Sequence, residues 1–127
     1  MSIEYNVSQN GLRIETFPKG VLETKGTIDY FAKLKNDTRI QKGAVEVVNF
    51  KDVTDYQVSY LECEAIAENY QEPKDIKMIY STVFVCETDL SYGIGRMLNA
   101  LHEIINPNHK VGVVRSESDV EDAIKNL

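Results

Sequence analysis

The sequence predicts an α/β protein with a single mixed, mostly parallel sheet of about five strands. Two observations lead to this fold class. Hydrophobic residues switch between a period of two and a helical period along the chain. After an N-terminal hairpin, strands and helices alternate, which implies parallel pairing through right-handed crossovers. The 127 residues suffice for one domain, so we expect residues 1–127 to fold as a unit.

The first elements are expected to form an antiparallel β-hairpin. Residues 3–8 alternate apolar and polar side chains, as a half-exposed strand does, and residues 9–11 are a turn signal. The alternation resumes at Leu12 and Ile14. This hairpin adds an antiparallel edge to the predicted sheet.

Helices and strands then follow in the order α-β-α-β-α-β-α. Mainly apolar segments rich in β-branched residues are typical of buried strands, and they lie at 44–50, 78–86 and 111–114. The helices are expected from Thr24 or Thr27 to Asn36, and over 59–72, 88–105 and 118–127. Helical spacing predicts the buried faces. The first helix should bury Ile28, Phe31, Ala32, Leu34 and Lys35, and the third should bury Leu90, Ile94, Met97, Leu98, Leu101, Ile104 and Ile105.

Composition and charge exclude several functions. The formal net charge is −6, so binding to nucleic acid or to an anionic membrane through bulk charge is not expected. Cys63 and Cys86 cannot build a disulfide framework and are expected to be free thiols in a reducing compartment. The first residues lack the features of a signal peptide, and no apolar run approaches the roughly 20 residues that span a bilayer. We therefore expect a cytoplasmic protein without a membrane span.

Two segments carry a resemblance to a known family. Val45–Tyr56 reads VEVVNFKDVTDY, and Cys86–Met97 reads CETDLSYGIGRM. With the order of elements over nearly the whole chain, they resemble the STAS-like superfamily of anti-sigma-factor antagonists, the SpoIIAA-like group, and in particular its small bacterial members. The resemblance implies one STAS-like domain over residues 1–127 with a SpoIIAA-like fold. It also implies a non-catalytic protein-interaction or regulatory module, and a homodimer is compatible with this.

The same resemblance implies a regulatory serine at the start of the helix after the central strand. Ser59 lies nearest to that position, although no acid directly precedes it and no glycine follows it. A phosphate there would meet a favourable helix N-terminus. The run from Ser59 to Glu62 also matches a capping box, in which the Ser59 hydroxyl accepts the backbone N–H of Glu62. Ser59 is thus either a helix cap or a switch.

Acidic residues surround this serine. Between residues 52 and 72 there are six acids and no lysine or arginine. Such a run is typical of a solvated helix face or of a docking surface for a basic partner protein. The candidate partner-binding or regulatory residues are Asp52, Asp55, Ser59, Glu62, Glu64 and Glu68.

Two further functions stay open: a carrier that holds a small apolar ligand between helix and sheet, and an enzyme that uses the carboxyl ends of the parallel strands. Carboxylates expected at those strand ends can hold Mg²⁺ or simply cap turns, and they are Asp52, Asp55, Glu87 and Asp89. Arg115 is expected at the end of the last strand. The Gly93-Ile94-Gly95 run is expected to allow a close approach of helix and sheet rather than dinucleotide binding.

No catalytic residue is assigned from the sequence. Cys86 precedes a helix N-terminus, a setting that can lower a thiol pKa. However, His102 lies about three turns down the third helix, and His109 is expected in a loop at the opposite end of the sheet. Two histidines that far apart also argue against zinc. We expect no metal and no cofactor.

Overall fold

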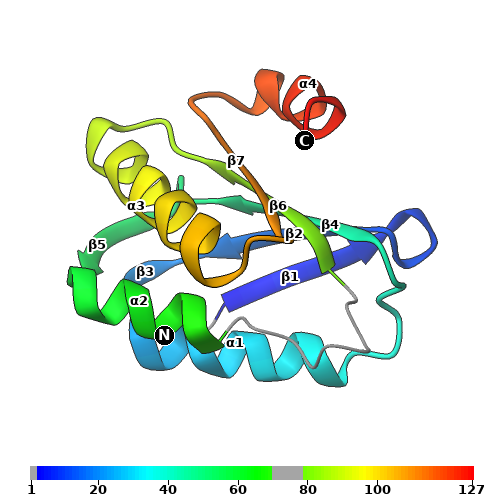
Figure 1. Ribbon diagram of the computed structural model, residues 1–127, viewed down its shortest axis with the longest axis horizontal. Coiled ribbons are helices and arrows are strands. Elements are labelled where there is room, and N and C mark those ends of the chain that lie inside the picture. Colours follow the sequence, from blue (N-terminus) through cyan, green and yellow to red (C-terminus); the bar gives the residue numbers. More distant parts are fainter. Residues whose placement is uncertain (1–2, 70–78) are drawn as a thin grey trace.

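The computed structural model describes residues 3–69 and 79–127, and it has the predicted mixed, mostly parallel sheet (Figure 1). The strand order is β1-β2-β4-β6-β7. The first pair is antiparallel and the others are parallel. The strands are β1 (Ile3–Ser8), β2 (Arg13–Pro18), β4 (Ala44–Asn49), β6 (Ile79–Val85) and β7 (Lys110–Val114).

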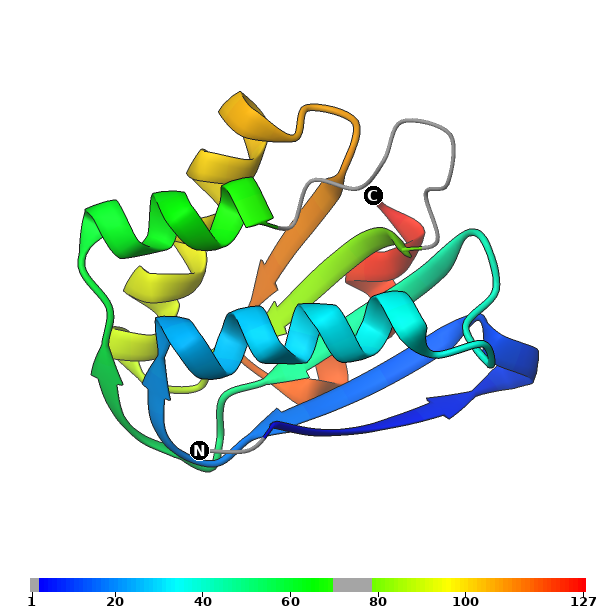
Figure 2. The same ribbon diagram turned by 90° about the horizontal axis from the view of Figure 1, so that it is seen from below.

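Three helices cover one face of this sheet, and a short fourth helix covers part of the other face. The crossovers from β2 to β4, from β4 to β6 and from β6 to β7 all step in the same direction across the sheet. Because such crossovers are right-handed, their helices lie on the same side of the sheet. Figures 1 and 2 show α1, α2 and α3 together on that side and α4 opposite them. The helices are α1 (Thr24–Asn36), α2 (Tyr60–Asn69), α3 (Asp89–Ile105) and α4 (Val120–Lys125).

The predicted hairpin is present, with a 3-10 turn over Gln9–Gly11 between its strands. Gln9, Asn10 and Gly11 have φ values of 53°, 57° and 87°. A glycine is needed at position 11, because a Cβ there would lie 2.2 Å from the carbonyl oxygen of Arg39.

A second, two-stranded parallel sheet was not expected from the sequence. It pairs β3 (Gly20–Glu23) with β5 (Val53–Gln57). Val53 and Tyr56 pack against the buried cluster around Phe50, whereas the other β5 side chains are exposed. Each strand has at most five residues, so its pairing is set by the tertiary structure rather than by its own pattern.

The buried face of α1 agrees only in part with the prediction. Leu34 is buried as predicted, but Tyr30 is buried as well, whereas Ala32 and Lys35 are exposed. The correction has a chemical reason: the Tyr30 hydroxyl finds hydrogen-bond partners inside the protein, so its ring can be buried as completely as an aliphatic side chain. The helix is therefore turned relative to the face predicted from Ile28 and Phe31.

The stripe predicted for α3 is confirmed except at two residues, and its members Met97 and Ile105 are partly buried against the core. Ile94, Leu98 and Leu101 are buried, but Leu90 and Ile104 are 62% and 76% exposed. Both residues lie in the terminal turns of this 17-residue helix.

None of the helices in the described part of the chain combines the length and the apolar character that a membrane span requires.

The close approach expected at the glycine run occurs at Gly95. A Cβ there would lie 2.8 Å from Cys86 Sγ and 3.0 Å from Val113 Cγ1, whereas Gly93 faces open space. The absence of a side chain at Gly95 therefore lets α3 pack directly on β6 and β7.

Candidate functional site

A cavity lies between the sheet and the three helices that cover it. Its volume is about 50 Å³, and its described lining comes from β1, β2, β3, β4, β6 and the helices α1, α2 and α3. A buried water molecule needs roughly 10 to 15 Å³ of such space, so the cavity has room for several non-hydrogen atoms. Most of the wall is apolar, and the polar lining side chains are Thr16, Thr27, Tyr30, Glu46, Thr82 and His102.

Glu46 is the acid at the polar end of this cavity. It lies in β4, the central strand, and is 2% exposed. The strand pleat directs Glu46, Val48 and Phe50 to the face covered by three helices, where all three line the cavity. Sequence reasoning assigned the segment to a buried strand and did not single out this residue. The available signal was a lone acid within an apolar run over 44–50.

Hydroxyl groups hold both oxygens of the Glu46 carboxylate. Tyr30 on α1 donates a short hydrogen bond to Oε2, and Thr82 on β6 donates to Oε1 at 2.8 Å. The Thr16 hydroxyl on β2 lies 2.6 Å from the Tyr30 hydroxyl. Burying a charge is costly unless it is hydrogen-bonded in this way. The network therefore explains how an acid occupies the middle of the sheet.

Two histidines extend the network, and here the sequence prediction was wrong. His109 Nε2 lies 2.8 Å from Thr82 Oγ1, and the centroids of the His102 and His109 rings are 5.2 Å apart. The two histidines were expected to lie far apart. They are close because His102 lies in the last turn of α3 and the loop to β7 brings His109 back beside it. Asn106 in that loop contacts His102 Nδ1 through its side-chain nitrogen at 3.0 Å.

The arrangement combines polar groups with an apolar cavity, as small-molecule sites do. A carboxyl group, three hydroxyls and the His102 imidazole lie at one end of the cavity, and His109 contacts one of the hydroxyls from behind the lining. The apolar walls lower the local dielectric constant, which strengthens each polar interaction at that end.

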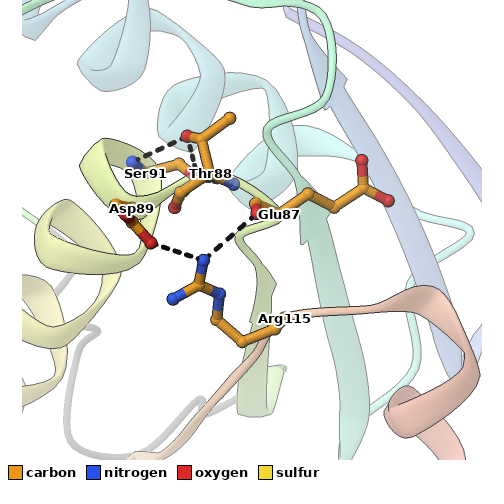
Figure 3. A network of polar contacts seen from close by, with 5 residues as sticks. All are labelled: Glu87, Thr88, Asp89, Ser91 and Arg115. Atoms are coloured by element: carbon orange, nitrogen blue, oxygen red, sulfur yellow. Dashed lines mark hydrogen bonds and ion pairs between the residues drawn. The ribbon is translucent and has the colours of Figure 1, made fainter.

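The strand-end rim, the other candidate, is occupied by contacts within the protein (Figure 3). Arg115 Nη2 donates to Asp89 Oδ1 at 2.7 Å and to the Glu87 carbonyl at 3.3 Å, while the Glu87 carboxylate points away. Thr88 and Ser91 form the capping box of α3. In the described part of the chain, no group of three or more His, Cys, Asp or Glu is placed to hold a metal ion. The rim therefore caps α3 and fastens it to the end of β7.

Both cysteines are buried and poorly suited to nucleophilic chemistry. Burial raises the pKa of the Cys86 thiol to about 12 and that of the Cys63 thiol to about 11. The nearby Arg115 lowers the pKa of Cys86, but burial outweighs it. Neither residue is in a disulfide. At neutral pH these thiols are protonated.

The residues predicted for partner binding lie along β5 and α2. Ser59 Oγ accepts the Glu62 backbone N–H at 3.2 Å, so the predicted helix-cap hydrogen bond is present. The Glu62 carboxylate also accepts a hydrogen bond from Thr24 Oγ1 at 3.0 Å. The other members are exposed, apart from the half-buried Glu64, and they are Asp52, Asp55 and Glu68.

The opposite face of the sheet has a different polar site beside α4. Arg13 on β2 is 8% exposed, and its Nη2 donates to Glu121 Oε1 at 2.8 Å. Asn49 Nδ2 donates to Glu117 Oε1 at 2.7 Å. These residues line an open groove of about 180 Å³. Glu15 Oε1 also lies 3.9 Å from Arg13 Nε, so two carboxylates pair with one guanidinium and the groove is a surface ion-pair network.

The chain matches no protein-family model, no curated protein and no solved structure at a significant level. The resemblance to the STAS-like superfamily therefore stays a prediction.

Proposed function

We propose that this protein binds a small, mainly apolar molecule in the cavity between the sheet and helices α1, α2 and α3. The single observation that carries the proposal is the cavity itself, with an apolar wall and a polar end at Glu46. A buried acid is expensive for a protein to retain when stability alone is at stake. Its presence beside an apolar cavity supports a role in recognition.

The test uses two neighbouring valines of β4. Val48 and Val47 are 6% and 7% exposed, and they point to opposite faces of the sheet. Val48 lines the cavity, whereas Val47 lines the groove beside α4. Val48→Phe should fill the cavity, and Val47→Phe is the matched control because it makes the same change on the other face.

Each protein is incubated with a cell extract of lipids and small metabolites and examined by native mass spectrometry. We expect an added mass on the wild type and on Val47→Phe, and its loss from Val48→Phe. Thermal denaturation checks that both variants fold. Equal added mass on both variants, or none on any of the three proteins, would contradict ligand binding in this cavity.

Docking of a basic partner protein is the second candidate, and one observation favours it. Leu61 is 73% exposed on α2, and Glu64 and Glu68 follow it at helical spacings that place all three on one side of the helix. An exposed apolar residue flanked by acids fits a partner whose surface is basic around an apolar spot.

A charge reversal tests this second candidate. Glu68→Lys should remove a partner captured from a native lysate, and Glu103→Lys, which makes the same change at an exposed position of α3, should not. Rising salt should weaken the capture by the wild type, because exposed charges are screened. Identical capture by both variants would mean that the acids of α2 are a solvated surface.

A further inference from the structure

We propose that two copies of this protein pair through strand β1 and form a dimer whose sheet is continuous across both copies. The two β1 strands run antiparallel about a two-fold axis that passes between the Asn6 residues of the two copies. This inference goes beyond the proposed function, because it concerns the outer edge of the sheet rather than the cavity.

Strand β1 has one unpaired side. Among the described residues it pairs only with β2, in a continuous register from Ile3 to Ser8. Alternate residues of an antiparallel pair direct their backbone groups to the neighbour, so half of the β1 residues direct N–H and C=O groups outward. Figure 2 shows β1 along the lower margin of the sheet, with no described element beyond it. These outward groups are a template for another strand.

The two edges of the five-stranded sheet differ in their protection. Native edge strands are commonly blunted by lysine, by proline, by a bulge or by a covering helix. Strand β1 contains neither lysine nor proline, and its register with β2 has no shift. Strand β7 begins with the exposed Lys110, contains Gly112, and has α3 and α4 packed against it. Of the two edges, β1 is therefore the one that favours pairing.

The side chains of β1 alternate in a pattern that is complementary to itself. Tyr5 and Val7 pack against a buried cluster on the α1 face, whereas Glu4, Asn6 and Ser8 are exposed. A two-fold axis perpendicular to the sheet keeps each face on its own side. Tyr5 of each copy then lies opposite Val7 of the other copy. An aromatic side chain opposite a β-branched one is a stabilising cross-strand pair.

The charge of Glu4 selects the register of this pairing. With the axis at Asn6, Glu4 lies opposite Ser8 of the other copy, and the two Glu4 residues are about 13 Å apart along the strands. An axis at Tyr5 would halve that separation, and an axis at Glu4 would place like charges directly opposite each other, which is destabilising. The register centred on Asn6 keeps the two negative charges farthest apart.

Tyr5 is already ordered for such an interface. Its hydroxyl donates to Asp37 Oδ2 at 2.8 Å, and its ring meets the Tyr30 ring edge-on with centroids 5.8 Å apart. Pairing therefore costs little further side-chain entropy. Because one strand of six residues is a small interface, the dimer should dissociate reversibly at concentrations between about 1 µM and 1 mM.

Disulfide cross-linking tests the register. Asn6→Cys places two thiols opposite each other across the axis, within the roughly 7 Å between Cα atoms that a disulfide tolerates. Ser8→Cys is the matched control on the same face of the same strand, and its two thiols should be about 13 Å apart. Both native cysteines are buried. Under air oxidation with a copper–phenanthroline catalyst, the Asn6→Cys dimer should form at least roughly tenfold faster than the Ser8→Cys dimer.

Sedimentation velocity tests the dimer without a cross-link. The wild type should sediment with twice the mass of one chain at high concentration and as a monomer after dilution. Asn6→Lys should remain a monomer, because it places two positive charges opposite each other on the edge. Asn126→Lys, which makes the same change at an exposed position after α4, should dimerise like the wild type. Thermal denaturation checks that both variants fold.

Three results would overturn the proposal. The first is a wild type that stays monomeric up to about 1 mM, the weakest affinity expected for such an interface. The second is a dimer that Asn6→Lys leaves intact, which would place the interface elsewhere. The third is equal cross-linking of Asn6→Cys and Ser8→Cys, since a pairing centred on Asn6 brings only the first pair of thiols together.

Discussion

Among the described residues, one face of the sheet buries Arg13 and the other buries Glu46, and the partners of these two side chains differ. In the parallel register Arg13 pairs with Val45 and Ile14 pairs with Glu46. The pleat therefore sends Arg13 toward α4 and Glu46 toward the three-helix face. Glu46 is 2% exposed and is held by buried hydroxyls. Arg13 is held by Glu121, whose side chain is 70% exposed.

The difference shows which of the two charges is essential to its surroundings. If Arg13 were removed, water could solvate Glu121. If Glu46 were removed, Tyr30 and Thr82 would lose the acceptor of their buried hydroxyl hydrogens. Among the described residues, Arg13 Nε itself lacks a hydrogen-bond partner, so the α4 face tolerates an imperfect arrangement. The three-helix face is the more precisely built.

The largest expected effect is that of Glu46→Leu. Leaving two buried hydroxyl donors without their acceptor should lower the free energy of unfolding by about 3 kcal/mol. Urea denaturation of the wild type and the variant measures this. A loss below about 1 kcal/mol would mean that the hydroxyls find other acceptors and that the two faces are alike.

Next is a pair of glycine substitutions, one on each face. At Gly95, a Cβ would lie 2.8 Å from Cys86 Sγ, so Gly95→Ala should cost about 2 kcal/mol. At Gly112, the nearest atoms to a Cβ are 3.5 to 3.8 Å away, on Leu127, Val83 and Ala123. Gly112→Ala should therefore be neutral or stabilising. Equal melting temperatures for the two variants would contradict the tighter packing of the three-helix face.

Alkaline pH should act on the three-helix face. The pKa values of Cys63, Cys86 and Tyr56 are raised to about 11, 12 and 12, in each case mainly by burial, and all three pack in one cluster on this face. A raised folded-state pKa contributes stability below the unfolded value, and this is lost as pH rises through the folded value. For Cys86 the loss should begin near its ordinary value of 9.0 and continue to about 12.

Urea midpoints measured at pH values from about 8 to about 11 check this decline. A variant with Cys63→Ala and Cys86→Ala is the control, and its midpoint should depend less steeply on pH over the same range. If the slopes are equal, the thiols do not cause the decline.

The smallest expected effect is that of Arg13→Met. Methionine keeps much of the apolar stem, and the abandoned Glu121 is solvated, so the loss should be about 1 kcal/mol or less. Arg13 also holds the pKa of Glu121 below its ordinary range. The stability of the wild type that depends on this pair should be lost as pH falls below about 4.5. The stability of the Arg13→Met variant should therefore fall less steeply than that of the wild type as the pH is lowered below about 4.5. A decrease in unfolding free energy as large as that of Glu46→Leu would contradict the difference between the two faces.

The sequence was sufficient for the five-stranded sheet because the strands at 44–50 and 78–86 are marked by local composition, but it did not predict the pairing of β3 with β5. It was sufficient for the Ser59 cap for the same reason, since that contact spans only three residues. The Glu46 network joins β2, α1, β4, β6 and the loop before β7, so strand register and loop path determine it. Neither is encoded by local periodicity, and the proximity of His102 and His109 was missed for this reason.

The span of this network along the chain also bears on synthesis. Glu46 emerges from the ribosome well before Thr82 and His109, and β4 cannot satisfy its acid from the preceding residues alone. The polar end of the cavity is therefore assembled only when β6 and the start of β7 are in place. A nascent chain that ends before residue 82 should hold an incomplete site, and competence to bind a ligand should arise together with the last long-range contacts of the fold.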